Sequence, residues 1–183
     1  MAAKLDFKSL ENAELLLVVA PSDSTQQVTL DILKYFVNTK NSFCVYVTVS
    51  KPYNTIINIL NKSGIKTDRI FFIDCITSLS TSSSVMRAGN CVFCQPQALT
   101  NISIALTNAI ESLPKDNDKL LILDTLSTLM LYNEAGTVTR FAHVLTGKLR
   151  AWGVKSIILT LEEETDKKII AQLGQFCDKT ITI

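Results

Sequence analysis

Short apolar runs alternate with segments of helical periodicity along this chain. Most of the runs are continuously apolar, as expected of parallel strands that are covered on both faces. We expect strands over Leu15–Ala20, Phe43–Val49, Arg69–Asp74, Cys91–Cys94, Leu120–Asp124 and Ser156–Leu161, with an edge strand at Lys179–Ile183. We expect helices over about Ser24–Asn38, Tyr53–Lys62, Thr100–Leu113, Thr137–Ala151 and Glu163–Phe176. This alternation predicts an α/β fold of three layers, α/β/α, around a mainly parallel, doubly wound sheet.

Turn and capping residues mark the ends of several expected helices. The run Ser24–Gln27 reads STQQ and predicts a capping box. Gly64 and Gly153 follow expected helices at positions that suit a left-handed residue. The polar tract Thr77–Asn90 predicts a long loop, because strand-like sequence resumes directly after it. We therefore expect a single domain over residues 1–183.

Composition indicates a large core and a restricted set of partners. Of 183 residues, 47% are hydrophobic and 19% are charged, which is enough for a core on both faces of a sheet. The mean hydropathy of +0.25 indicates buried strands or an apolar surface covered by a partner. The net charge is +1 and the longest basic cluster is Lys167–Lys168, so nothing supports nucleic-acid binding.

Nothing in the chain predicts membrane insertion or secretion. The apolar runs end after about six residues, far short of the roughly 18 that a bilayer requires. Met1–Asn12 carries charges of both signs, unlike a signal peptide. Five cysteines without a framework fit a reducing compartment. We expect a cytoplasmic protein.

The stretch Leu15–Phe36 has the outline of a nucleotide-binding strand, loop and helix. A phosphate-binding loop at this place would read G-x-x-x-x-G-K-[ST], with glycines for close backbone approach and a lysine for the phosphates. The chain has no glycine before Gly64 and no lysine in this loop. The stretch therefore predicts the fold without its phosphate chemistry.

The order of the segments resembles the RecA/KaiC-like ATPase superfamily, from about Glu14 to Ile183. The stretches that carry the resemblance are Phe43–Pro52 (FCVYVTVSKP), Gly64–Asp74 (GIKTDRIFFID), Leu120–Tyr132 (LLILDTLSTLMLY) and Arg140–Ile158 (RFAHVLTGKLRAWGVKSII). The resemblance implies a RecA-like P-loop NTPase fold. Within the superfamily the chain is similar to archaeal RecA-like proteins linked to signal transduction.

The resemblance places residues of this chain at the positions of the phosphate-binding loop. Pro21 stands at the first glycine, Gln26 at the second, Gln27 at the lysine and Val28 at the metal-binding hydroxyl. A shift of one residue would place Thr29 at the hydroxyl, but would supply neither glycine nor lysine. The chain therefore lacks a Walker A motif. Losing the lysine removes the main positive charge from the β- and γ-phosphates.

Acidic residues of the family occupy two further positions, and this chain keeps an acid at one of them only. Val45–Lys51 reads VYVTVSK where the family has VYVTLEE, so Ser50 and Lys51 replace the acids that activate water. We expect Lys51 to be a solvated surface residue. Asp124 stands in the place of the Walker B aspartate that holds Mg²⁺.

Two aspartates at strand ends have a structural interpretation that we prefer to metal binding. Asp124 could cap the next short helix by accepting hydrogen bonds from the amides of Leu126 or Ser127. Asp74, which ends the run IFFID, has the same two interpretations.

Other candidate sites have simpler structural explanations. Cys91 and Cys94 have C-x-x-C spacing, but residues three apart on a strand point to opposite faces, so we expect core cysteines and no metal site. His143, the only histidine, lies inside an expected helix, where we expect partial burial or a surface position. Lys148–Arg150 fits an ordinary amphipathic face. The run Glu162–Glu164 fits the start of a helix, where the helix dipole favours acids.

These observations lead to a hypothesis of a pseudo-ATPase, not an enzyme, that needs neither ATP nor Mg²⁺. We expect a regulatory or scaffold protein, in archaeal signal transduction if the resemblance extends that far, whose partner is another protein or a second copy of the chain. One alternative is a weak, unorthodox nucleotide binder that uses the helix start with Ser22, Ser24 and Thr25. A second is a recombinase paralogue that modulates DNA pairing. A receiver-type domain would need an acid pair after the first strand, where Asp23 stands alone.

Overall fold

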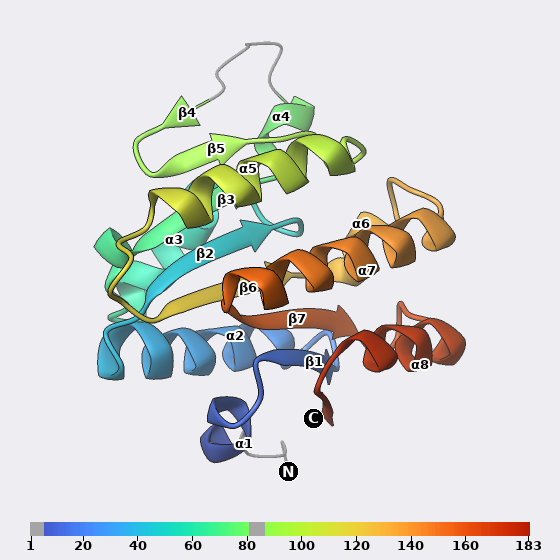
Figure 1. Cartoon of the computed structure of the whole chain (residues 1–183). Coiled ribbons are helices and arrows are strands. Elements are labelled where there is room, and N and C mark those ends of the chain that lie inside the picture. The colour runs from blue at the N-terminus through green and yellow to red at the C-terminus, as the bar shows by residue number, and fades with distance from the viewer. Residues whose placement is uncertain (1–5, 81–86) are drawn as a thin grey trace.

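The computed structural model describes residues 6–80 and 87–183, and these form an eight-stranded sheet with helices on both sides (Figure 1). The strand order is β4-β5-β3-β2-β6-β7-β1-β8, and all pairs are parallel except β4 with β5. The strands are β1 (Leu15–Ala20), β2 (Phe43–Thr48), β3 (Ile70–Asp74), β4 (Arg87–Ala88), β5 (Cys91–Phe93), β6 (Lys119–Asp124), β7 (Lys155–Leu161) and β8 (Lys179–Thr182). The predicted α/β/α fold with a mainly parallel sheet is confirmed.

Helices cover the two faces of the sheet. They are α1 (Phe7–Glu11), α2 (Thr25–Leu33), α3 (Tyr53–Lys62), α4 (Thr77–Ser80), α5 (Leu99–Ser112), α6 (Leu126–Leu129), α7 (Ala135–Trp152) and α8 (Lys167–Phe176), with a π-helix at Lys34–Thr39 and a 3-10 helix at Thr67–Arg69. The expected helix over Ser24–Asn38 is therefore α2 followed directly by the π-helix. Residues of α2 and α3 pack on one face, and those of α5, α7 and α8 pack on the other.

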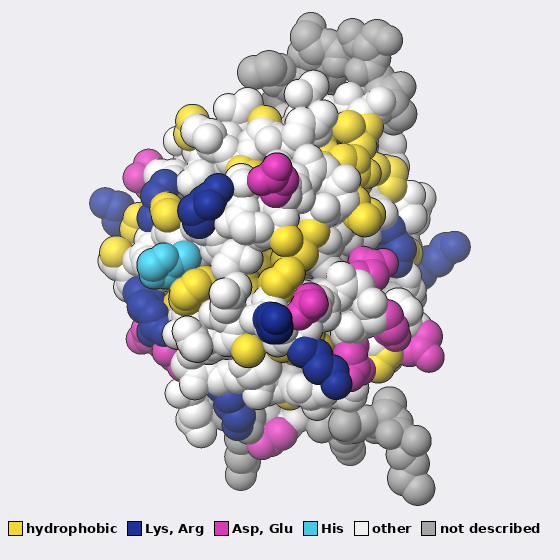
Figure 2. Space-filling view, turned by 90° about the vertical axis from the view of Figure 1, so that its right-hand side faces the viewer, with side chains coloured by type: hydrophobic (Ala, Val, Ile, Leu, Met, Phe, Trp, Pro, Cys, Tyr) yellow, Lys and Arg dark blue, Asp and Glu magenta, His cyan; other side chains and the backbone are white. Residues whose placement is uncertain are grey.

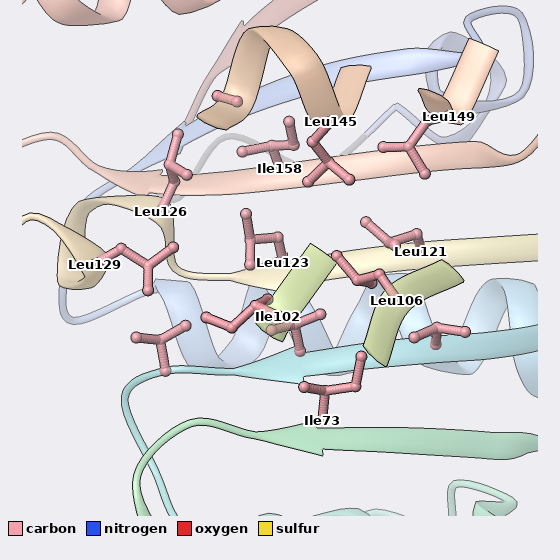
Figure 3. Close-up of a cluster of buried hydrophobic side chains, with 14 of the residues drawn as sticks. Ile73, Ile102, Leu106, Leu121, Leu123, Leu126, Leu129, Leu145, Leu149 and Ile158 are labelled. Carbon is pink, nitrogen blue, oxygen red and sulfur yellow. The ribbon is translucent and has the colours of Figure 1, made fainter. Parts of the chain in front are cut away.

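Side-chain alternation along each strand explains the two apolar layers. Leu15 and Leu17 of β1 face the layer under α5, α7 and α8, whereas Leu16 and Val18 face the opposite layer. In Figure 3, side chains from α5 and α7 meet those of β6 and β7 in the first of these layers. Both faces are buried, which explains why the strands read as continuous apolar runs.

Several predicted boundaries are confirmed. The bounds of β1 and α3 match the expected ranges, and β8 is an edge strand that pairs with β1. Gly64 (φ 69°) and Gly153 (φ 62°) have the left-handed backbone expected after α3 and α7. Helices α1 and α6 were not predicted, because four or five residues are too few to show a helical period.

Two predictions about the segment before α8 are wrong. Helix α8 begins at Lys167 and not at Glu163, because the Asp166 carboxylate accepts a hydrogen bond from the Lys168 amide (2.7 Å) and caps the helix there. Glu162–Glu164 therefore lie in a turn, away from the helix start.

The tract Thr77–Asn90 is not wholly a loop, since it begins with α4 and includes β4; residues 81–86 lie outside the described part. Among the described residues, no helix is long and apolar enough to cross a lipid bilayer.

Candidate functional site

A cavity of about 210 Å³ opens at the carboxyl ends of the central strands. Ligands of open α/β sheets bind at this edge. The loop after β1, helices α2 and α3, and the ends of β2, β6 and β7 form the cavity. Its lining residues are Ser22, Thr25, Gln26, Thr29, Leu30, Tyr46, Ser50, Lys51, Ile56, Ile59, Leu60, Asp124, Thr125 and Leu161.

The loop between β1 and α2 is closed by hydrogen bonds to the Pro21 carbonyl. This oxygen accepts from the amides of Ser24 (3.2 Å) and Thr25 (3.1 Å), and from their hydroxyls at 3.1 and 2.7 Å. The predicted capping box is therefore wrong, because Ser24 is at the N-cap but its side chain accepts no backbone amide. Gln27 instead donates to Asp31 (2.8 Å) on the exposed side of α2. The Pro21 carbonyl thus occupies two amides at the helix start, those of Ser24 and Thr25.

An acidic side chain also binds this loop. The Ser22 amide donates to both carboxylate oxygens of Glu163, at 3.1 and 3.3 Å. Glu163 belongs to the turn between β7 and α8, and sequence reasoning missed its role because the two residues are 141 positions apart. A negative charge therefore lies on the loop that would hold phosphate in a nucleotide-binding relative.

Only some of the residues at the phosphate-loop positions line the cavity, namely Gln26 and the alternative Thr29. Gln26 and Gln27 are exposed, and Val28 is buried in the core between α2 and the sheet. Thr29, the alternative hydroxyl position, lines the cavity, but its hydroxyl donates to the Thr25 carbonyl (3.0 Å). Pro21 is half-buried. The described residues at these positions therefore include neither a lysine nor a glycine that would hold a phosphate.

Asp124 lies buried at the end of β6, and the hydroxyl of Tyr46 donates a hydrogen bond to its carboxylate. The predicted cap on α6 is wrong, because Thr125 occupies the N-cap position of that helix without a side-chain cap bond. Burial raises the pKa of the Asp124 carboxyl above its ordinary value of 3.8, whereas the hydrogen bond from Tyr46 and the charge of Lys51 act to lower it. The next peptide bond, Asp124–Thr125, is cis.

Tyr46 is a site residue that sequence reasoning missed. Thr48 of β2 pairs with Asp124 of β6, so Tyr46 lies two residues earlier on the same face of the sheet, within reach of the carboxylate. A tyrosine in an otherwise apolar strand was the available signal, since a buried hydroxyl needs a partner. Only the strand register identifies that partner.

Lys51 joins β2 to α2 at the rim of the cavity. Its ammonium donates to the Gln26 side-chain carbonyl at 2.6 Å, and its backbone is held by the Thr48 hydroxyl. Lys51 is half-buried, and its contact with Gln26 is exposed, so it lies at the surface as predicted but is held there by a hydrogen bond. Ser50 is exposed beside it and also lines the cavity.

Asp74 has the structural role that we preferred for it. This fully buried carboxylate accepts from the amides of Tyr53 (2.7 Å), Ile76 (2.7 Å) and Thr77 (2.9 Å), and from the Thr77 hydroxyl (2.5 Å). These hydrogen bonds therefore stabilise the start of α3 and the turn into α4.

The remaining candidates also have structural roles. Cys91 and Cys94 are buried in the two opposite core layers, and the described residues include no cluster of potential metal ligands. His143 is exposed and stacks on Phe176, with ring centroids 4.5 Å apart. On the same helix, Lys148 donates to the Ser103 hydroxyl at 2.9 Å.

Solved structures share this fold. A KaiC-like protein, PH0186, from the hyperthermophilic archaeon Pyrococcus horikoshii OT3 superposes with a TM-score of 0.67 and 11% identity, over 91% of this chain and 69% of that one. The uncharacterized protein PH0321 from Pyrococcus horikoshii, in complex with an unknown peptide, superposes with a TM-score of 0.73 and 12% identity, over 96% of this chain and 82% of that one. The chain therefore has a KaiC-like, RecA-like fold.

Sequence comparison places the chain in a family without assigning an activity. No curated protein matches it. A model of a family of unknown function, DUF7504, matches residues 14–183. The chain therefore belongs to the family DUF7504.

Proposed function

We propose that this KaiC-like domain has no ATPase activity and works by binding a protein partner, as a regulatory or scaffold protein. The observation that carries the proposal is the contact between the Ser22 amide and the Glu163 carboxylate. A phosphate at this loop would have to displace that carboxylate or lie beside it, and like charges repel. The Pro21 carbonyl already accepts from the amides of Ser24 and Thr25, so these two donors are not free to bind a phosphate.

The missing lysine supports the same proposal. A phosphoryl-transfer site needs positive charge on the β- and γ-phosphates. Lys51 is the cation among the lining residues of the cavity, but the Asp124 carboxylate in the same lining adds a negative charge that disfavours a phosphate. The alternative of a weak nucleotide binder therefore receives little support from the loop.

The surface at the strand ends suits a protein partner. Leu131 and Tyr132, in the connection after α6, are 72% and 38% exposed, and Leu79 on α4 is 45% exposed. Since α4 and α6 follow parallel strands, these side chains lie on the same edge of the sheet. Figure 2 shows this side of the molecule, where hydrophobic side chains form a band with charged side chains around it. Exposed apolar patches often mark interaction sites.

One relative gives independent support. PH0321 shares the fold and was solved with a peptide bound. We therefore propose that a segment of a partner protein binds at the strand-end surface of this chain. A role in archaeal signal transduction is the biological setting that the resemblance to archaeal RecA-like proteins suggests.

The absence of ATPase activity is tested by incubating the purified chain with ATP and Mg²⁺. We expect no phosphate release above that of an Asp124→Ala variant. Release by the unchanged protein that disappears in Asp124→Ala would overturn this part of the proposal. A thermal shift with ATP and ADP, read in the same preparation, checks binding without turnover.

Partner binding is tested separately by affinity capture from extracts of the source organism. The bait is used unchanged, as a Leu131→Ser/Tyr132→Ser variant, and as Ile104→Ser, which removes another exposed apolar side chain, from α5. We expect a protein that binds the first and third baits and is lost with the second. If every captured protein also binds the double variant, the strand-end surface is not the binding site.

A further inference from the structure

The cavity contains a buried acid with a carboxylate oxygen that no protein group uses. One oxygen of Asp124 accepts from Tyr46, and the other has no hydrogen-bond partner among the described residues. In that part of the chain, every fully buried side-chain oxygen or nitrogen has a partner. The second Asp124 oxygen is therefore not fully buried, and Asp124 is one of the residues that line the cavity.

A positively charged group, the Lys51 ammonium, lies at the rim of the same cavity. The Lys51 ammonium has three donors, and it uses one of them on Gln26. It is close enough to Asp124 for its charge to act on the pKa of that carboxyl. The polar part of the cavity therefore presents one negative and one positive group.

The rest of the lining is largely aliphatic. Leu30 comes from α2, Ile56, Ile59 and Leu60 come from α3, and Leu161 comes from the end of β7. Such a wall binds branched aliphatic groups by excluding water. The cavity volume of about 210 Å³ corresponds to roughly seven water molecules, well below the roughly 300–1,000 Å³ of sites for drug-sized ligands.

We propose that this cavity binds a free aliphatic α-amino acid, of the leucine, isoleucine or valine type. The ligand ammonium would bind the free oxygen of Asp124, the ligand carboxylate would bind Lys51, and the branched side chain would lie on the wall of α3. A zwitterion matches both charges of the lining, whereas a simple amine leaves Lys51 without a counterion. A simple carboxylic acid likewise leaves the buried Asp124 unpaired.

This site is independent of the proposed protein partner. The amino acid enters a cavity between α2 and α3, whereas the exposed apolar side chains are Leu79 on α4 and Leu131 and Tyr132 after α6. Either proposal can fail without the other.

Isothermal titration calorimetry of the full chain tests the assignment. The ligands are L-leucine, 3-methylbutylamine, which lacks the carboxylate, and 4-methylpentanoate, which lacks the ammonium. We expect saturable binding of L-leucine with a Kd of about 1 mM or tighter, and binding at least about tenfold weaker for each truncated ligand.

Two charge variants and their controls locate the site. Asp124→Asn and Lys51→Met should each weaken L-leucine binding by about tenfold or more, because each removes one ionic contact. Asp116→Asn and Lys62→Met change exposed charges outside the cavity and should leave the Kd unchanged. Circular dichroism confirms that each variant is folded.

A third variant keeps the test decisive if Asp124→Asn does not fold. Ile59→Trp fills the cavity from a half-buried position without changing a charge, and it should abolish binding. No heat of binding at about 10 mM L-leucine overturns the proposal, since this is about ten times the weakest Kd expected. Equal binding of either truncated ligand, or unchanged binding by the folded cavity variants, also overturns it.

Discussion

The hydroxyl of Tyr46 on β2 donates a hydrogen bond to the carboxylate of Asp124 on the neighbouring strand β6, and both side chains are buried. In a nucleotide-binding relative the aspartate at this position would serve the metal. Here a protein hydroxyl holds one of its oxygens. The pair therefore links the core of the sheet to the floor of the cavity.

Removing the hydroxyl should destabilise the protein. Tyr46→Phe leaves the buried Asp124 carboxylate without its protein donor, which we expect to cost about 1–3 kcal/mol in the free energy of unfolding at pH 7. Urea denaturation measures this loss. In an Asp124→Asn background the same substitution should cost clearly less, because the charged acceptor is absent; an equal cost would show that the hydrogen bond is not its source.

Asp124 should also make stability depend on pH. Burial raises its pKa in the folded protein above the ordinary 3.8, so between the unfolded and folded pKa values the folded state binds more protons. The contribution of this group therefore falls as the pH rises through that window. Denaturation curves of Asp124→Asn, taken from about pH 4 upward, should lack this fall. If variant and unchanged protein keep a constant difference across that range, Asp124 does not titrate as proposed.

Glu163 should control anion binding at the loop after β1. Glu163→Ala removes the carboxylate from the Ser22 amide, so phosphate should stabilise this variant more than it stabilises the unchanged protein. The rise in Tm should be about 1 °C when phosphate is present at a concentration equal to its Kd. Glu162→Ala, an exposed neighbour, is the control. Equal phosphate shifts in both variants would assign the effect to net charge alone.

A side chain at Gly174 on α8 should destabilise the protein. A Cβ at this position would lie 2.9 Å from the Thr180 hydroxyl oxygen on β8, so Gly174→Ala should destabilise the protein by about 1 kcal/mol or more despite its better helix propensity. Gly147→Ala on α7, where a Cβ meets nothing within 4 Å, should instead be stabilising by up to about 1 kcal/mol. Thermal denaturation compares the two, and Thr180→Ala should rescue the first.

Asp178 should stabilise the edge of the sheet at neutral pH. Burial acts to raise its pKa, but hydrogen bonds from the Leu15 and Glu14 amides and from Arg150 outweigh this effect, so the pKa lies below 3.8. Its contribution is therefore present above about pH 4 and is lost as the pH falls through the folded value. Asp178→Asn should cost about 1 kcal/mol at pH 7 and less at acid pH. A cost that stays the same at acid pH would contradict the ionic explanation.

Local sequence patterns predicted most of the fold. Continuous apolar runs identify buried parallel strands, and Gly64 and Gly153 mark helix ends because glycine accepts a left-handed backbone. The start of α8 was harder to predict, because Glu163 and Asp166 both suit a helix start and only one can cap it.

The candidate site depended on contacts between distant residues. The sequence by itself determined that the loop after β1 has neither glycine nor lysine, and that an aspartate ends β6. Tertiary structure decided that Glu163 binds Ser22, that Tyr46 binds Asp124, and that α2 and α3 enclose an aliphatic cavity. The reason is physical: chemistry at one residue is a local property, whereas the partner of a buried or charged group depends on strand register and helix packing, which bring together residues far apart in the chain.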